Sequence, residues 1–400
     1  MRSPLDGIKV LDLTIFQNGP WATVMLSDMG AEVIKIEDPV NGDPGRNLQI
    51  AGGRPRPIST YFQTLNRNKK AITLDLKQRE GREVFYTMAK TADVITQNFR
   101  VGVVEKLGID YETIRKINPK IVYGSVSGFG PRGPHARHGV FDILGMARGG
   151  LMSLLSASLP DVHYDGHGGL ADQTGAIILA YGVLLGIIAR ERYGIGQHIQ
   201  TSQLGGQLML QALAINGYLL NGEPPKPRFR THMHNPLFNI YKCGDGKWIA
   251  MGGIQPDRYW KNFCKVLGIE HVADDPRYST MEGRRQHPDE VIAVLDKAFL
   301  QRDRDAWLPL FQEYDILCAP VQGYADLPND PQIIANGYFT ELQHPVLGTL
   351  KEVGVPLTLS ETPGAARAPA PEYGEHTEDV LLSYGYTWEQ LTALRDKKVI

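Results

Sequence analysis

One acidic residue, Asp172, stands where a glycine-rich loop gives way to a long apolar segment. The loop runs from Asp165 to Asp172, and nearly every residue from Gly175 to Ala189 is apolar. A carboxylate at the start of a helix can act as an N-cap that accepts hydrogen bonds from first-turn N–H groups. It can also be a nucleophile or base at the mouth of a pocket, because glycines let a ligand approach the backbone. Spacing alone favours the first interpretation and leaves the second open.

A second glycine motif, Gly128 to Gly133, matches the G-x-G-x-x-G pattern of dinucleotide-binding loops. Such a loop needs a helix that starts within it, so that the first N–H groups face the pyrophosphate. Pro131 and Pro134 interrupt that start, and the motif follows a later strand instead of the first. The pattern therefore argues against NAD or FAD and against a nicotinamide-dependent oxidoreductase.

Composition and charge disfavour several other classes of protein. The 42 Lys and Arg residues nearly balance the 44 Asp and Glu residues, without a basic tract, which argues against nucleic-acid or membrane-surface partners. The three cysteines, Cys243, Cys264 and Cys318, lie far apart without metal-ligand spacing, so we predict no metal site and a reducing cytoplasm. The first residues contain no apolar core of signal-peptide length, and we do not expect export.

Strands and helices alternate through the first part of the chain. The expected strands are 8–13, 33–36, 71–74, 93–96 and 121–125, and the expected helices are 20–29, 81–90, 101–107 and 111–117. This alternation predicts an α/β fold with a Rossmann-like, mostly parallel sheet covered on both faces. The apolar run after Asp172 is too short to cross a bilayer, so we expect a helix buried on all sides that ends near Gly194.

The pattern of expected strands and helices changes after a proline-rich linker at 222–227. Segments 238–243 and 247–251 flank Gly244-Asp245-Gly246, a hairpin signal, and helices are expected near 258–267, 288–300 and 304–313. Later strands are expected near 318–322 and 348–357, with an extended connection at 365–371 and a last helix near 387–394. We therefore expect a large α/β domain over 1–224, a smaller α+β domain over 225–320, and a return to the large domain with a C-terminal tail over 321–400.

Several short motifs follow one another along the chain. They are PLDGIKVLD at 4–12, GAEVIKIE at 30–37, LNRNKK at 65–70, LDLK at 74–77, NFR at 98–100, SGFG at 127–130, DQTG at 172–175 and GEHT at 374–377. Their order resembles that of the class III CoA-transferases, the CaiB/BaiF family that includes the formyl-CoA:oxalate type. The resemblance extends from residue 4 to about 380.

This resemblance implies an enzyme that moves CoA from an acyl-CoA thioester to a free carboxylic acid. Asp172 is the implied nucleophile, which forms an aspartyl anhydride and then an aspartyl-CoA thioester. Such covalent catalysis divides one difficult exchange into easier steps, and it needs a dry pocket because water would hydrolyse the anhydride. Coenzyme A would be a cosubstrate instead of a resident cofactor, the other partner would be a small carboxylic acid, and the protein would be an interlocked homodimer.

Further residues match functional positions of the family. Gln17 matches a donor to a carbonyl or oxyanion, Asp142 an acidic residue beside the nucleophile, and Gly252 and Gly253 a loop that covers it. Their structural alternatives are a surface amide, a helix N-cap and an ordinary loop. The positions that match CoA contacts are Leu74, Asp75, Leu76, Lys77, Asn98, Phe99, Arg100, Lys106, His138, Gly139, Val140 and Phe141. Any single cation among them is otherwise a solvated surface charge.

One position departs from the family, because Asp38 stands where formyl-CoA transferase has an arginine that helps to bind the nucleotide. Candidates for holding the CoA phosphates instead are Arg46, Arg54, Arg67, Lys69 and Lys70.

Two functions other than CoA transfer remain open. An acyl-CoA racemase of the same fold needs a base on each side of the carbon, and Phe141 stands where its catalytic histidine would be, although His135, His138 and His167 are nearby. A non-catalytic CoA-binding protein would not require a carboxylate at residue 172. The acyl donor and acceptor are not determined by these motifs; Trp21, Tyr61, Phe62, Phe141 and Tyr241 suggest an acid larger than oxalate.

Overall fold

The computed structural model describes residues 2–49, 58–156, 159, 161–162, 168–224 and 229–400. Two compact units divide the chain. The larger unit comprises residues 1–155, 162–223 and 334–400, and the smaller one comprises residues 156–161 and 224–333.

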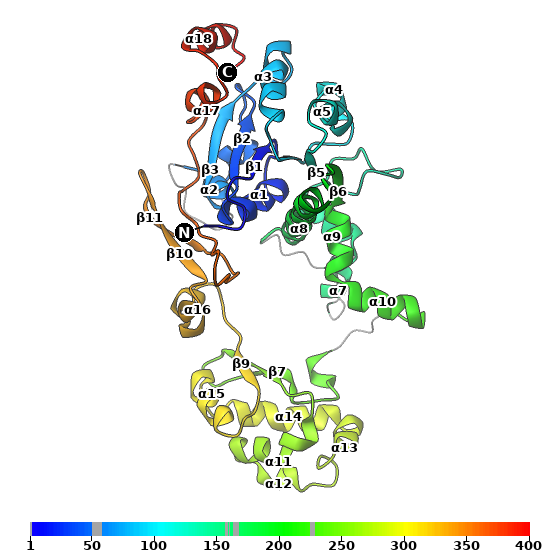
Figure 1. Cartoon of the computed structure of the whole chain (residues 1–400). Coiled ribbons are helices and arrows are strands. Elements are labelled where there is room, and N and C mark those ends of the chain that lie inside the picture. The colour runs from blue at the N-terminus through cyan, green and yellow to red at the C-terminus, as the bar shows by residue number, and fades with distance from the viewer. Residues whose placement is uncertain (1, 50–57, 157–158, 160, 163–167, 225–228) are drawn as a thin grey trace. The chain divides into compact units, whose positions relative to one another are not determined.

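A six-stranded parallel sheet forms the centre of the larger unit (Figure 1). Its spatial order is β3-β2-β1-β4-β5-β6, with β1 (Lys9–Asp12), β2 (Glu32–Glu37), β3 (Lys69–Thr73), β4 (Val94–Gln97), β5 (Val122–Ser127) and β6 (Gln197–Ser202). The five strands expected from the sequence are confirmed, whereas the edge strand β6, with its polar sequence, was not expected. The strand order reverses between β1 and β4, and this is where ligands bind in open sheets of this kind.

Helices and one hairpin complete the larger unit. The helices are α1 (Asn18–Asp28), α2 (Thr60–Asn66), α3 (Arg79–Ala89), α4 (Val103–Leu107), α5 (Tyr111–Ile117), α6 (Asp142–Arg148), α7 (Leu151–Leu155), α8 (Leu170–Tyr193), α9 (Gln203–Leu210), α10 (Ala212–Asn221), α17 (Thr377–Ser383) and α18 (Trp388–Asp396). The short helix α16 (Pro331–Ala335) leads back into this unit, and β10 (Phe339–His344) pairs antiparallel with β11 (Gly348–Val353).

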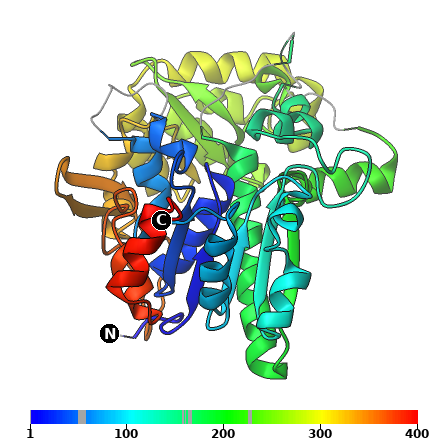
Figure 2. The same cartoon turned by 90° about the horizontal axis from the view of Figure 1, so that it is seen from above.

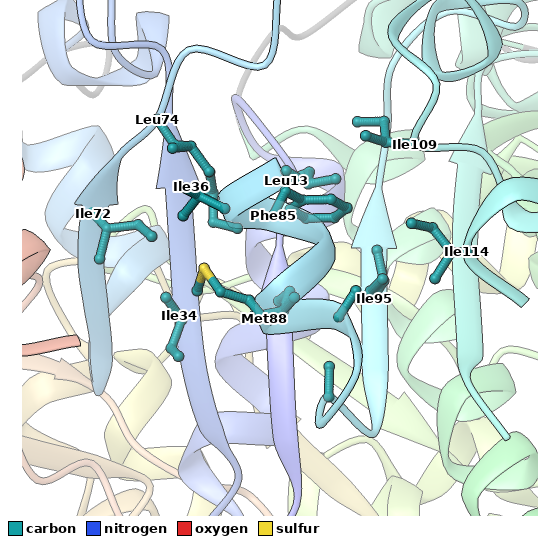
Figure 3. Packing of buried hydrophobic residues seen from close by; sticks show 14 of the residues in the cluster. Leu13, Ile34, Ile36, Ile72, Leu74, Phe85, Met88, Ile95, Ile109 and Ile114 are labelled. Carbon is teal, nitrogen blue, oxygen red and sulfur yellow. The ribbon is translucent and has the colours of Figure 1, made fainter. Parts of the chain in front are cut away.

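The sheet buries side chains on both faces, because successive strand residues point to opposite sides. One face carries Ile34, Ile72 and Ile95, which pack with Phe85 and Met88 of α3 (Figure 3). Leu11 belongs to the same cluster. Helices α17 and α18 add to this side, and Figure 2 shows them, in red, beside the blue strands of the sheet. The other face packs its valines against α1 and α8, among them Val10, Val33, Val94 and Val122.

Helix α8 is less enclosed than the sequence suggested. Leu179 and Val183 are buried, but Ile177, Tyr181 and Ile188 are each more than half exposed in the single chain. The expectation of a helix buried on all sides is therefore wrong for one copy. The helix has 24 residues and a mean hydropathy of 1.6, enough for a membrane span by length and composition, yet it packs against β5, β6 and α1 as a core helix.

The smaller unit pairs a three-stranded antiparallel sheet with helices. The strands β7 (Phe238–Lys242) and β8 (Trp248–Gly252) form the expected hairpin, and β9 (Cys318–Pro320) pairs with β8. Around them lie α11 (Pro256–Leu267), α12 (Glu270–Ala273), α13 (Met281–Gln286), α14 (Pro288–Phe299) and α15 (Arg304–Glu313). Aromatic side chains fill the core of this unit, among them Trp260, Phe263, Phe299, Trp307 and Phe311.

Candidate active site

The loops that follow β1 and β4 meet at the point where the strand order reverses. Asn98, after β4, joins them, because its Oδ1 accepts a hydrogen bond from the Ile15 N–H at 2.9 Å. Its Nδ2 donates to the Ile15 carbonyl at 2.7 Å. Two loops from neighbouring strands thus form one continuous edge at the carboxyl end of the sheet.

A cavity of about 450 Å³ opens at this edge. It brings together most of the predicted site residues: Gln17, Asn98, Phe99, Arg100, His138, Gly139, Val140, Phe141 and Asp172. It also contains residues for which we predicted no site role, among them Asn18, Leu48, Ser127 and Gln203. Gln203 directly follows β6, so recognition of that strand would have placed it at the carboxyl edge of the sheet with the other site residues.

A second cavity of about 320 Å³ lies next to the first. Leu74, Asp75, Leu76 and Lys77 line it. Ile15, Phe99 and Val103 line both cavities. The two cavities thus share a wall, whereas Lys106, exposed on α4, lines neither of them.

Asp172 lies in the first turn of α8 and does not cap it. The N-cap residue is Gly169, with a φ of 62° and no side-chain hydrogen bond. The capping oxygen comes from Asp142 at the start of α6, whose Oδ1 accepts from the N–H groups of Ala171 at 2.6 Å and Asp172 at 3.1 Å. The N-cap interpretation of Asp172 is therefore wrong, while Asp142 caps a helix other than its own.

The carboxylate of Asp172 is held in an environment that disfavours its charge. Burial first and the neighbouring Asp142 carboxylate second raise its pKa to about 7, while the amides of Gln203 and Asn18 act in the opposite direction. Gln203 Nε2 donates to Asp172 Oδ1. Burial and the carboxylates of Asp172, Asp43 and Asp142 also raise the pKa of Tyr61, so its hydroxyl keeps its proton near neutral pH. Asp172 is ionised in part near neutrality and is poised for acid–base or nucleophilic chemistry.

Gln17 lies against the glycine turn that precedes Asp172. Its Nε2 donates to the Gly168 carbonyl at 3.3 Å, and the Tyr61 hydroxyl donates to its Oε1 at 3.5 Å. A side chain on Gly169 would collide with the Gln17 amide. The glycine at this position thus allows Gln17 to reach the cavity beside Asp172.

A buried ion pair fixes the loop that carries Gln17. Lys35 Nζ lies 2.8 Å from Asp43 Oδ2, both side chains are fully buried, and Lys35 also donates to the Thr14 carbonyl at 2.7 Å. Asp43 Oδ1 accepts from the Phe16 N–H at 3.1 Å. Phe16 has a φ of 62°, a strained conformation that persists only where its surroundings enforce it. The Lys35–Asp43 pair therefore holds the loop at two points, Thr14 and Phe16.

The cations proposed for the CoA phosphates have other partners. Among the described candidates, Arg46, Arg67, Lys69 and Lys70 form ion pairs with Glu37, Asp28, Asp12 and Glu32, in that order. Arg54 lies outside the described residues. Asp38 pairs with Lys77 at 2.8 Å beside the second cavity. Arg100 lines the first cavity, is exposed, and has no ion-pair partner in the described part of the chain.

The aromatic candidates separate into two groups. Tyr61 and Phe141 line the first cavity, and the Phe141 ring packs edge-on to Phe16 at 5.7 Å. The others are structural: Trp21 and Phe62 stack with Arg67 and Arg46, and Tyr241 is buried in the smaller unit.

Two of the three histidines near residue 141 are described. His138 lines the first cavity, and its Nδ1 lies 3.2 Å from Nδ1 of His135. His167 lies outside the described residues. Phe141 itself cannot carry the proton that a racemase would need at that position.

Gly252 and Gly253 belong to the smaller unit. Their N–H groups donate to the carbonyls of Leu317 at 2.9 Å and Leu237 at 2.7 Å. Their predicted role as a cover for Asp172 stays a prediction. No group of three or more His, Cys, Asp or Glu side chains is arranged to hold a metal ion within the described residues.

The comparisons with known proteins agree on one family. Residues 5–377 match CoA-transferase family III. The chain is 34% identical to acetyl-CoA:oxalate CoA-transferase of Acetobacter aceti, over 84% of this chain and 85% of that protein. It is 30% identical to (R)-2-hydroxy-4-methylpentanoate CoA-transferase of Clostridioides difficile, over 99% of both.

A solved structure supports the same assignment. The structure of a CaiB/BaiF family protein from Brucella suis superposes with a TM-score of 0.85 at 28% identity, covering 96% of this chain and all of that one. With the six-stranded parallel sheet and a family match over nearly the whole sequence, this chain belongs to CoA-transferase family III.

Proposed function

We propose that this enzyme transfers CoA between carboxylic acids through covalent intermediates on Asp172. Members of the family transfer CoA between an acyl thioester and a carboxylic acid, and the proposal concerns the residues that do so here. The observation that carries it is the position of the Asp172 carboxylate, in a cavity of about 450 Å³ at the sheet's switch point, with its pKa raised to about 7. It is held by amide donors and is not used as a helix cap.

The reaction needs four acyl transfers. The ionised Asp172 attacks the thioester carbonyl of the donor, expelling CoA thiolate and leaving a mixed anhydride. The thiolate attacks the aspartyl carbonyl, which forms the aspartyl-CoA thioester and releases the donor acid as its carboxylate. The acceptor carboxylate then attacks that thioester, giving a second anhydride and the thiolate. Attack of the thiolate on the acceptor's carbonyl produces the new acyl-CoA and restores Asp172.

The surroundings of Asp172 suit these steps. Tyr61 donates to Gln17 Oε1 and so orients the Gln17 amide beside the cavity, where its second N–H can donate to the carbonyl oxygen of the bound thioester as it becomes an oxyanion. The apolar lining, with Leu48, Val140 and Phe141, limits the water that would hydrolyse an anhydride.

We propose that CoA extends along the two adjoining cavities. The wall formed by Ile15, Phe99 and Val103 would contact the middle of the molecule, with Leu74 to Lys77 at one end and Asp172 at the other. Arg100 is the candidate for a phosphate contact, because it is exposed at the first cavity without a carboxylate partner in the described chain. Lys77 is already neutralised by Asp38.

Replacing the nucleophile tests the proposal. We expect Asp172→Ala to lower CoA transfer by about 10⁴-fold or more, because no covalent route remains. Chromatography of the CoA products, with acetyl-, formyl- and succinyl-CoA as donors and a panel of acids, gives the rate and the preferred pair. Asp161→Ala, at an exposed carboxylate, is the control. Near-normal turnover by Asp172→Ala would refute the assignment.

We also propose that the protein is a homodimer, and that a second copy covers the apolar surface that one chain exposes. Helix α10 contains no buried residue, and Leu213, Leu219 and Leu220 on it are exposed by 91%, 70% and 84%. Ile177, Tyr181, Leu185 and Ile188 form a further apolar stripe on α8. Large exposed apolar patches on soluble proteins mark interaction sites, so these faces suit contact with a second copy.

A further inference from the structure

Two buried amides lie beside the carboxylate of Asp172. Gln203, at the start of α9, is 5% exposed, and Asn18, at the start of α1, is 6% exposed. Gln203 donates through Nε2 to Asp172 Oδ1, and Asn18 lines the same cavity and lowers the pKa of that carboxyl. Two elements distant in sequence thus direct N–H groups at one side chain.

The chemistry of a carboxylate fixes which end of each amide faces Asp172. A carboxylate only accepts hydrogen bonds, so the NH₂ group of each amide faces Asp172. Asn18 Oδ1 and Gln203 Oε1 are then buried without a partner among the described residues. An unpaired buried acceptor lowers the stability of the fold.

Glycines make room for both amides. A Cβ at Gly175 of α8 would lie 2.5 Å from Asn18 Nδ2, and a Cβ at Gly145 of α6 would lie 3.2 Å from Gln203 Oε1. The close approach of α1, α6 and α9 to α8 therefore depends on residues without side chains. The amides have little space in which to leave Asp172.

We propose that Asn18 and Gln203 form an oxyanion hole for the aspartyl carbonyl, distinct from the donors that face the substrate's carbonyl. This rests on the proposed function, in which Asp172 is acylated. Two of the four steps proceed through attack on Cγ of Asp172 itself. When the acceptor carboxylate attacks the aspartyl-CoA thioester, its oxygen forms a bond to Cγ and the C=O electron pair moves onto Oδ1. The oxyanion then re-forms the carbonyl, and the electron pair of the C–S bond leaves with the CoA thiolate.

The same donors serve the preceding step, in which the thiolate attacks Cγ of the first anhydride and the donor acid leaves as its carboxylate. In both steps the negative charge develops on the oxygen to which Gln203 already donates. Donors fixed in advance around such an oxygen stabilise the transition state. The first and last steps place their charge on the substrate's oxygen instead, so they depend on other donors.

This division gives a kinetic test with a matched control. Gln203→Met removes the donor and nearly keeps the volume. The control is Gln207→Met, which makes the same change of side chain one turn later on α9. The Gln207 amide is also buried, and its Oε1 also lacks a partner among the described residues. Gln207 donates instead to the Leu170 carbonyl and the Thr174 hydroxyl, so it does not touch Asp172. Asn18→Ala is the second test variant.

Two rates are compared for each variant at about pH 8.5, well above the unperturbed carboxyl range, so that Asp172 stays ionised although Asp142 and Tyr61 face it. The first rate is complete CoA transfer to an acid. The second is formation of acyl hydroxamate from acyl-CoA and hydroxylamine, which intercepts the first anhydride at the substrate's carbonyl and needs only the first step.

We expect Gln203→Met and Asn18→Ala to lower complete transfer by about 10²-fold, the usual effect of losing one oxyanion donor. The hydroxamate rate should change less than about 3-fold, and Gln207→Met should leave both rates near wild type. An equal fall in both rates would mean that the amides only position Asp172, and unchanged transfer would mean that they do nothing; either outcome overturns the proposal. If Asp172→Ala still produced hydroxamate above the enzyme-free background, the proposed function itself would fail instead.

Discussion

At the scale of single residues, opposed influences act on the pKa of one carboxylate, that of Asp172. Burial and the charge of Asp142 raise the pKa of Asp172, and two amides lower it. A carboxylate with a raised pKa is a stronger nucleophile once ionised, but a smaller fraction of it is ionised near neutrality. Asp142 has two roles beside this carboxylate. Its Oδ1 caps α8, and its negative charge raises the pKa of Asp172.

Neutralising Asp142 separates these two roles. Asp142→Asn keeps an oxygen that can accept from the N–H groups of Ala171 and Asp172 and removes the charge. The pKa of Asp172 should fall, on the order of one unit. In the proposed mechanism activity requires the ionised form and is lost as the pH falls through that pKa, so we expect the acidic limb of kcat/KM, near pH 7 in the wild type, to move to lower pH.

The profile of kcat/KM against pH measures this shift. Asp110→Asn is the control, because Asp110 caps α5 and lines neither of the two cavities. An acidic limb that stays in place, or moves upward, would contradict the electrostatic assignment of Asp142.

At the scale of elements, the site depends on how the strand ends are held together. The order of the strands brings the β1 and β4 loops side by side, and Asn98 links them. Asp12 and Lys35 are partners in the β1–β2 register, so charged side chains are buried next to the loop that carries Gln17. Glu37 and Arg46 extend this network, since Glu37 accepts from the Asp43 N–H and pairs with Arg46.

Breaking the Lys35–Asp43 pair tests the role of this network. Lys35→Met leaves Asp43 as an uncompensated buried charge, which costs about 3–5 kcal/mol of folding stability. It also frees the Thr14 carbonyl, so Phe16 should relax and Gln17 should lose its position. We expect a lower free energy of unfolding in urea and a lower kcat, measured below the unfolding transition.

Lys70→Met on β3 is the matched control. Lys70 pairs with Glu32 at 2.6 Å, but both side chains are more than 40% exposed, and exposed pairs contribute little to stability. Equal losses in the two variants would show that burial of the Lys35–Asp43 pair has no special role.

At the scale of the whole molecule, one chain leaves apolar surface uncovered. The exposed stripe of α8 and the exposed leucines of α10 come from the region that also supplies Asp172 and Gln203. A second copy that covers these faces would therefore add rigidity to the helices around Asp172.

Light scattering combined with size-exclusion chromatography tests this proposal. We expect twice the 44.4 kDa of one chain at micromolar concentration. Leu219→Glu together with Leu220→Glu on α10 should yield monomer or aggregate, because charge would replace buried apolar contact. Leu300→Glu, at an exposed residue after α14, should leave the dimer intact. A wild-type monomer under these conditions would refute the homodimer.

Strands with a regular hydrophobic pattern were predicted well from the sequence, whereas elements without such a pattern were missed. Strands β1 to β5 carry apolar side chains on both faces, which makes them visible in the sequence. Strand β6 reads Gln-His-Ile-Gln-Thr-Ser, and α2 is a single short helix, so neither has a clear period. Missing β6 also meant missing Gln203, which donates a hydrogen bond to Asp172.

The sequence by itself determined the parallel α/β architecture, the prominence of Asp172 and, through its ordered motifs, the resemblance to class III CoA-transferases. Only the tertiary structure decided what Asp172 does not do: Gly169 is the N-cap and Asp142 supplies the capping oxygen. It also decided that four candidate phosphate-binding cations are committed to ion pairs and that two distant amides face the carboxylate. The physical reason is that periodicity and local motifs record which residues are buried, whereas hydrogen-bond partners and pKa values depend on distances between residues far apart in the chain.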